Sequence, residues 1–205
     1  MLTLKEFKEA RGVLSGVIRN TSLVYSPAFS KATGNQIYIK PENMQVTGAY
    51  KIRGAYYKIS TLSDEEKARG LVTASAGNHA QGVAYAAQAA GVKATVYMVL
   101  DAQGSFAVET ALTLHDRASL RLVQVLGAHG GALLYAKMDA DCAPGAGVGM
   151  TQILMGQGDL YSDNDTELVG DGSRYSAQIG YLGRGSQTID VNVVVNHYGK
   201  NTACE

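Results

Sequence analysis

Apolar side chains in the first hundred residues alternate between helical and strand-like spacing. The helical spacing predicts three helices, near residues 4–17, 48–59 and 80–90. Short apolar runs predict strands at residues 36–40, 71–74 and 94–99. A strand, a helix and a second strand in this order favour parallel pairing through a right-handed crossover. The first half is therefore predicted to be an α/β layer.

The second half shows short alternating segments between glycine turns. Turns begin at Gly156, Gly170 and Gly183, which lie 14 and 13 residues apart, and Gly185 and Gly199 are again 14 apart. Segments between them, such as residues 186–196, alternate with a period of two, which is typical of half-buried strands. This regular spacing favours an all-β repeat, and periodicity alone leaves a meander, a barrel and a solenoid open.

The same alternation predicts which way individual side chains point. Three apolar residues are expected to face inward: Leu168, Ile179 and Val193. Three charged residues are expected at exposed turns: Asp171, Arg184 and Lys200. In a solenoid, strands one coil apart would pair in parallel, whereas a meander would pair them antiparallel. Unpaired strand edges would favour self-association.

Composition narrows the possible classes of protein. Hydrophobic residues make up 46% of the 205-residue chain, which is enough for a globular core. There is no apolar run of roughly 20 residues, and charged residues follow Met1 closely, so the chain is expected in the cytoplasm, without a membrane partner. Cys142 and Cys204 lack metal-ligand spacing and are expected to be free thiols, with no metal bound.

Charge changes sign between the halves. Residues 1–100 hold 12 Lys and Arg against 6 Asp and Glu, and residues 101–205 hold 6 against 12. The basic half has no run of like charge interleaved with aromatic residues, so we expect no nucleic-acid partner.

Two motifs in the first half carry candidate chemistry. Thr47–Gly54 places Lys51 at a predicted helix start directly after Tyr50, where the helix dipole and partial burial would disfavour the ammonium form and favour a nucleophilic amine. Ser75–Gly82 is a small-residue loop between a strand and a helix, whose backbone N–H groups would face an anion. Either motif alone is also compatible with an ordinary surface lysine or an ordinary connection.

Together with the leader Ile39–Gln45, these motifs resemble threonine dehydratase and its relatives in the fold-type II pyridoxal-phosphate (PLP) enzymes, over residues 1–98. The resemblance implies that Lys51 forms a Schiff base with PLP and later moves the substrate α-proton. It also implies that Asn78 hydrogen-bonds the cofactor 3-hydroxyl and that Tyr50 packs where the family usually has Phe. The substrate carboxylate would be held by a loop of four residues: Ser75, Ala76, Gly77 and His79. The implied reaction converts threonine or serine to a 2-oxo acid and ammonia.

Two parts of that family's site have no match after residue 98. These are a later glycine-rich loop that grips the cofactor phosphate and a Ser or Cys that faces the pyridine nitrogen. The run Gly127–Gly131 is the nearest loop, but it lacks the flanking pattern. Weak or absent PLP binding is therefore expected, because binding and orientation both depend on the phosphate contact.

Residues from about 116 to 205 resemble the SufB/SufD iron-sulfur cluster assembly proteins. The matching stretches are Ala118–Val125, Gly158–Ser162, Thr166–Ser173, Ile179–Gly183 and Asn196–Thr202. The resemblance implies a right-handed parallel β-helix, which selects the solenoid, and pairing with Suf-type protein partners. No cluster-ligand role is expected for Cys204 or His197, since the family's functional Cys and His residues lie mainly beyond the matched region.

The sequence thus predicts a mixed fold, in which an α/β parallel-sheet fragment is followed by a parallel β-helix fragment. Its expected parts are residues 1–98, a junction at 99–115, and residues 116–205. Three functions stay open: an incomplete PLP-dependent threonine/serine ammonia-lyase (a carbon-nitrogen lyase) that takes a small amino acid, a SufB/SufD-like scaffold, and a fusion with neither activity. Residues 101–105 are expected to be exposed.

Overall fold

A computed structural model describes residues 2–75 and 77–205. The chain divides into two compact units, each formed by two stretches of sequence. We call Met1–Ala68 with Gly77–Ala90 the helical unit, and Arg69–Ala76 with Gly91–Glu205 the solenoid unit. Among the described residues, no helix is long and apolar enough to span a bilayer.

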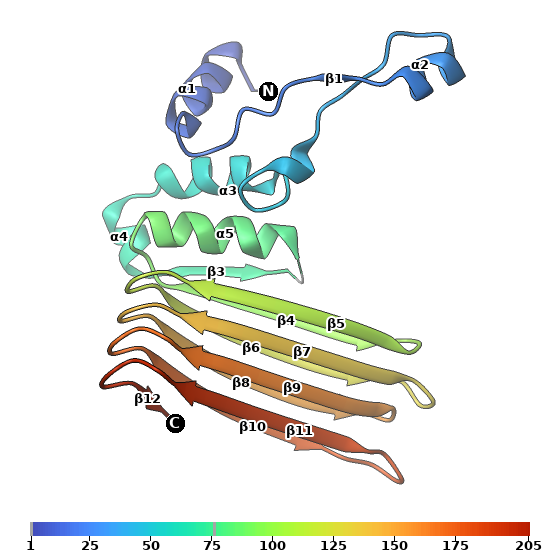
Figure 1. The fold of residues 1–205 in the computed structure, drawn as a ribbon, viewed down its shortest axis with the longest axis vertical. Helices are drawn as coiled ribbons and strands as arrows, with labels where there is room; N and C mark the ends of the chain where they lie inside the picture. The colour runs from blue at the N-terminus through green and yellow to red at the C-terminus, as the bar shows by residue number, and fades with distance from the viewer. Residues whose placement is uncertain (1, 76) are drawn as a thin grey trace. The chain divides into compact units, whose positions relative to one another are not determined.

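The helical unit contains five helices, a 3-10 turn and one small hairpin (Figure 1). In chain order these are α1 (Leu4–Leu14), β1 (Val24–Tyr25), α2 (Pro27–Thr33), β2 (Tyr38–Ile39), η1 (Glu42–Met44), α3 (Lys51–Ser60), α4 (Asp64–Ala68) and α5 (Asn78–Ala89). Helix α1 begins with a capping box, in which Thr3 accepts from the Glu6 backbone and Glu6 accepts from the Thr3 backbone. The strand predicted at residues 36–40 has only two ladder residues, which pair antiparallel with β1.

The core of the helical unit lies between α3 and α5. Ile52 is completely buried on α3, and Ala86 and Ala87 are nearly so on α5. The two helices approach closely at Gly82, where an added Cβ would lie 3.2 Å from the Ile52 backbone nitrogen. A glycine at this position therefore lets the second turn of α5 pack against the first turn of α3. The apolar face predicted on α1 is buried only at Leu14, because Leu4 and Phe7 are exposed.

The solenoid unit consists of two parallel sheets. One contains six strands in the order β12-β10-β8-β6-β4-β3, and the other contains four in the order β11-β9-β7-β5 (Figure 1). The strands are β3 (Leu71–Ala74), β4 (Ala94–Ala102), β5 (Phe106–Leu114), β6 (Ser119–Ala128), β7 (Leu133–Cys142), β8 (Gly147–Gly156), β9 (Asp159–Leu168), β10 (Arg174–Leu182), β11 (Ile189–His197) and β12 (Ala203–Cys204).

β3 pairs in parallel with β4, and from β4 onward each strand pairs in parallel with the next strand but one along the chain. Leu120 of β6 pairs with Val148 of β8, and Phe106 of β5 pairs with Leu134 of β7. Parallel pairing confirms the solenoid and excludes a meander of hairpins. The predicted unit of about 14 residues is nevertheless only half a coil, because consecutive strands enter different sheets before the chain returns to the first one.

Glycines recur at the turns because neighbouring coils touch there. A Cβ on Gly170 would overlap the backbone of Pro144, and one on Gly199 would overlap the backbone of Gly170. A Cβ on Gly158 would overlap the carbonyls of His129 and Ala132. The glycine period read from the sequence is thus the period of contacts between turns.

Inward-pointing side chains from both sheets form the solenoid core. Leu126, Leu134, Leu154 and Leu160 are at most 1% exposed and belong to one cluster. Leu168 is buried and Ile179 is half-buried against that cluster, as predicted. Val193 pairs with the buried Asn164, but it is 40% exposed because β11 is the last strand of its sheet.

The turn and boundary predictions have different outcomes. Asp171, Arg184 and Lys200 are exposed, as predicted. The boundary expected near residue 98 falls inside β4, and the segment expected as a junction at 99–115 contains the end of β4 and all of β5. Of residues 101–105, Ala102 is buried in the solenoid core and the others are exposed.

A buried polar chain crosses the interior of the solenoid unit. The Gln152 amide donates to Gln124 at 2.8 Å and accepts from the Ser162 hydroxyl at 3.0 Å. Asn164 donates to Ser162 at 3.0 Å and to the backbone carbonyl of Asn192 at 3.1 Å. These contacts satisfy groups that would be costly to bury without partners.

Candidate cofactor site

Lys51 is the first residue of α3 and its side chain is exposed. Its ammonium nitrogen lies 5.7 Å from the centre of the Tyr50 ring. The position at a helix start agrees with the sequence prediction, and the positive end of the helix dipole acts against a cation there. The partial burial that the sequence argument also invoked is absent, so solvent reaches this amine.

The segment before Lys51 is held by a carboxylate that the sequence did not single out. Arg53 donates two hydrogen bonds to Glu42, from Nε at 2.9 Å and from Nη2 at 2.8 Å. Thr21 donates a third to the same carboxylate at 2.7 Å. The Arg53 hydrogen bonds lower the pKa of Glu42 to about 2, against the opposing effect of burial. This pairing ties the η1 turn to the helix turn that begins with Lys51.

Gln45 fixes the same segment from the other side. Its side chain is buried, and its amide oxygen accepts from the Arg19 backbone N–H at 3.0 Å. Its amide nitrogen donates to the Arg19 carbonyl at 2.7 Å. A single side chain thereby replaces a pair of backbone hydrogen bonds between two loops. The loop that leads to Lys51 is therefore positioned by specific polar contacts rather than by regular secondary structure.

Asn78 and His79 begin α5, and both are exposed. Gly82 lies one turn further along α5 and packs on Ile52, the neighbour of Lys51. Lys51 and Asn78 are therefore the first residues of two helices that contact each other near these ends, with the second turn of α5 against the first turn of α3. Gly77 directly precedes Asn78 and is exposed.

The rest of the predicted loop divides between the units. Ser75 is half-buried at the end of β3, where its backbone N–H donates to the Tyr97 carbonyl at 2.9 Å in the solenoid unit. Ala76 lies outside the described residues. Among the described helices, α5 is the one that follows a strand through a short glycine-containing segment. Backbone N–H groups at such a helix start can bind an anion.

The run Gly127–Gly131 contains the last two residues of β6 and the first part of the turn between β6 and β7. Gly131 has a φ of +81° there, which a left-handed turn requires and glycine readily adopts. A strand rather than a helix follows it, so this run offers an anion no helix N-terminus.

A family model for pyridoxal-phosphate-dependent enzymes matches residues 14–139, which is more than half of the chain. The chain belongs to this family. The match begins at the end of α1 and extends past residue 98 into β7, so it covers most of the helical unit and the first strands of the solenoid unit.

Curated relatives match a shorter stretch. L-threonine ammonia-lyase of Thermotoga maritima is 57% identical over 98 residues, covering 48% of this chain and 24% of the relative. Biosynthetic L-threonine dehydratase of Lactococcus lactis is 47% identical over 98 residues, with the same coverage. The chain thus spans about a quarter of the length of these relatives. A solved serine racemase from Dictyostelium discoideum is 39% identical, with a TM-score of 0.46, over 49% of this chain and 33% of that one.

The residues around Lys51 fit part of a PLP molecule. An exposed amine can react with the cofactor aldehyde, and the Asn78 amide can donate to a ring oxygen. The α5 start offers N–H groups to an anion. For the cofactor phosphate, the described part of the helical unit provides no glycine-rich helix start apart from those of α3 and α5, which are already assigned to the reactive edge. The fit is therefore to the reactive edge of the cofactor.

Proposed function

We propose that this chain carries the amino-terminal part of a PLP-dependent threonine or serine ammonia-lyase site. The observation that supports this most is the packing of α3 against α5 at Gly82. Because α3 begins with Lys51 and α5 begins with Asn78, this packing holds both residues on neighbouring helices. The 57% identity to an L-threonine ammonia-lyase supports this reaction class within the family.

Each residue has a specific role in this proposal. Lys51 would hold the cofactor through its amine and would carry the substrate α-proton on that amine. Asn78 orients the cofactor ring through its amide, while Tyr50 covers one side of the lysine. Ser75, Ala76, Gly77 and His79 receive the substrate carboxylate. PLP, when bound, supplies an electron sink for the bond broken at the substrate α-carbon.

We further propose that the chain holds PLP weakly and turns over threonine negligibly. Orientation of the cofactor depends on its phosphate, and the contacts proposed above all lie at its reactive edge. An exposed Lys51 also leaves the covalent bond open to hydrolysis by water. The cofactor should therefore leave on dialysis.

Borohydride trapping tests the covalent role of Lys51. The purified chain mixed with PLP and reduced should carry the added mass on Lys51, as located by peptide mass spectrometry. Lys51→Ala should lose that label. Lys58→Ala, which removes an exposed lysine near the other end of the same helix, should keep it. Equal labelling in the Lys51→Ala variant would refute the assignment.

Production of 2-oxobutanoate from threonine tests the proposed weakness separately. The unmodified chain should produce none above the level of free PLP. Turnover that disappears in Lys51→Ala would show that the phosphate is held by some other segment, and the incomplete-site proposal would fail while the lyase proposal would stand.

A SufB/SufD-like scaffold is the second candidate, and the parallel coils from β6 onward are the observation that favours it. Folds alone are weak evidence of function. The test is co-purification with a Suf-type ATPase partner, compared with a chain that ends before β6. Failure of this test and of the trapping test together would favour the third candidate, a fusion with neither activity.

A further inference from the structure

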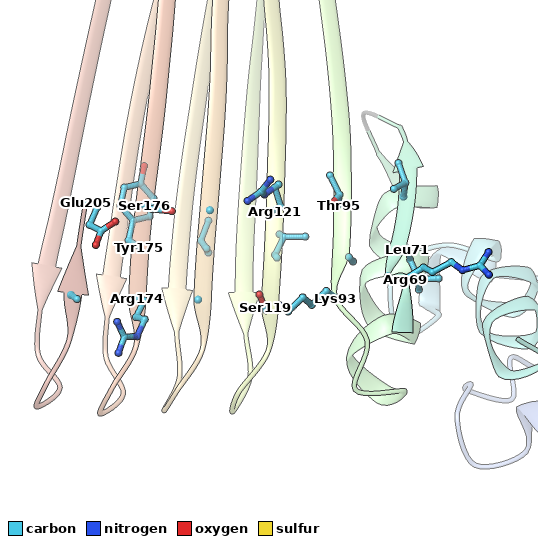
Figure 2. Close-up of a pocket in the computed structure, with 18 residues that line it drawn as sticks. Arg69, Leu71, Lys93, Thr95, Ser119, Arg121, Arg174, Tyr175, Ser176 and Glu205 are labelled. Carbon is cyan, nitrogen blue, oxygen red and sulfur yellow. The ribbon is translucent and has the colours of Figure 1, made fainter. Parts of the chain in front are cut away.

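A groove of about 510 Å³ crosses the outer face of the six-stranded sheet (Figure 2). Its lining comes from the beginnings of the strands and the residues just before them, all within the solenoid unit. It is distinct from the Lys51 segment, which belongs to the helical unit. Its volume lies in the range of sites for small molecules.

Two glycines on β8 create the hollow. Gly149 stands in the ladder between Arg121 of β6 and Ser176 of β10. Gly147 stands between Ser119 of β6 and Arg174 of β10. Because β8 has no side chains at these two outward positions, its backbone forms the floor between longer side chains on both neighbouring strands.

The groove is lined by cations that have no acidic partner. Arg69, Lys93, Arg121 and Arg174 are all exposed, and Glu205 is the one acidic residue in the lining. Within the described part of the chain, none of these four side chains forms an ion pair or hydrogen bond. Figure 2 shows Lys93 just before β4, Arg121 on β6 and Arg174 on β10, with Arg69 at the β3 end.

The unit's carboxylates gather on the other sheet. Asp139 and Asp165 are ladder neighbours on the four-stranded sheet, and so are Asp141 and Glu167. They alternate with buried residues and so point outward from that sheet. Apart from Glu205 in the lining, these carboxylates lie on the opposite face, so most of the repulsion among the four cations remains for a ligand to relieve.

We propose that this groove binds a small, elongated anion that carries two or more phosphate or carboxylate groups. Strands about 4.8 Å apart place the cations at intervals that one extended ligand can span. The Arg121 and Arg174 guanidinium groups bind such oxygens with paired hydrogen bonds, and Lys93 adds a point charge. Ser119, Ser176 and Thr95 supply hydroxyl donors between them.

A nucleic-acid strand is a poorer match. Single-stranded nucleic acids bind through exposed aromatic rings as well as through cations. The one aromatic residue in the lining is Tyr175, which is 3% exposed and points its hydroxyl at the Met150 sulfur. The groove thus offers charge without a stacking surface.

Calorimetric titration of the full chain tests the proposal, with tripolyphosphate, citrate and sulfate as probes. Tripolyphosphate or citrate should bind, and sulfate should bind at least tenfold more weakly because it reaches fewer cations. The stronger of the first two identifies the ligand as a phosphate or a carboxylate. Binding should weaken as salt is added.

Variants locate the site. A paired variant that combines Arg121→Ala and Arg174→Ala should weaken binding at least tenfold, because each substitution removes charged hydrogen bonds to the ligand. Gly149→Leu keeps the charge and fills the floor, so it should weaken binding similarly. Arg184→Ala removes an exposed arginine outside the groove and should leave affinity unchanged, as should Lys51→Ala.

Circular dichroism of each variant shows whether the fold is retained, and Gly149→Leu can be replaced by Gly149→Ser if it is not. Absence of binding for all three probes would overturn the proposal. Equal losses in Arg184→Ala and in the paired arginine variant would also overturn it, because they would indicate attraction to net charge alone. Unchanged affinity in the paired variant would do the same.

Discussion

The two units bury their apolar side chains to very different extents. In the helical unit Leu4, Phe7 and Phe29 are 58–70% exposed, and close packing is concentrated where α3 meets α5. In the solenoid unit Leu134, Leu154 and Leu168 are fully buried, and every inner coil repeats the same contacts. Repetition lets each coil bury its inner face against the next. Lys51 and Asn78 thus lie in the less buried unit.

A side chain at a turn glycine should disrupt the solenoid most. Gly170→Ala places a methyl group on the Pro144 backbone, which cannot move away as a side chain could. We expect a loss of about 3–5 kcal/mol, as for severe overpacking. Denaturant unfolding monitored by circular dichroism measures it. Gly180→Ala is the matched control, because open space surrounds that Cβ; similar losses in both variants would contradict this explanation.

The buried polar chain should give an intermediate effect. Gln152→Leu leaves Gln124 and Ser162 without their partner inside the core, at a cost of about 1–3 kcal/mol. Gln178→Leu makes the same change at an exposed position of the neighbouring strand and should cost less than about 0.5 kcal/mol. A neutral Gln152→Leu would mean that the network contributes nothing net to stability.

The Glu42–Arg53 pair should have the smallest effect, and it should depend on pH. The folded pKa of Glu42 is about 2, below its usual value near 4.3, so the stabilisation is fully present above about pH 5. It is lost as pH falls towards 2, because protonation removes the charge that Arg53 binds. Glu42→Gln should cost about 1 kcal/mol at pH 7, since the pair is partly exposed.

The Glu42→Gln variant also tests whether this ion pair stabilises the helix start that carries Lys51. Hydrogen exchange at the start of α3 should speed up in Glu42→Gln at pH 7, and the difference from the unmodified chain should shrink at pH 3. Glu9→Gln, which changes an exposed carboxylate on α1, is the control. A pH-independent difference would rule out the charge as its cause.

Local patterns predicted much of the solenoid. Alternation gave the inward positions of Leu168 and Ile179, and glycine spacing gave the turns, because both arise from contacts between adjacent residues or adjacent coils. Spacing could not reveal that two 14-residue segments make one coil, since this depends on which sheet each strand joins. Gln152 and Asn164 interrupt the apolar pattern, so nothing local indicates that they are buried together.

The candidate site was predicted from two short sequence motifs rather than from hydrophobic alternation or glycine spacing. Lys51 was predicted at a helix start, and the structure agrees. Asn78 was predicted in the loop before a helix at residues 80–90, whereas α5 already begins at Asn78. Glu42 could not be paired with Arg53 from the sequence, since an irregular loop separates them and its path decides the contact. The exposure of Lys51 was also not predictable, because it depends on what packs over the helix start.

The touching turns also constrain how such a chain can change its length during evolution. A single inserted residue within a strand would reverse which side chains enter the core, and one within a turn would separate a glycine from the backbone it accommodates. Copying a whole coil, such as residues 119–146, would preserve both relationships, because Ser119 and Gly147 already occupy equivalent ladder positions. Gene segments encoding complete coils are therefore the units by which this half of the protein can grow or shrink while still folding.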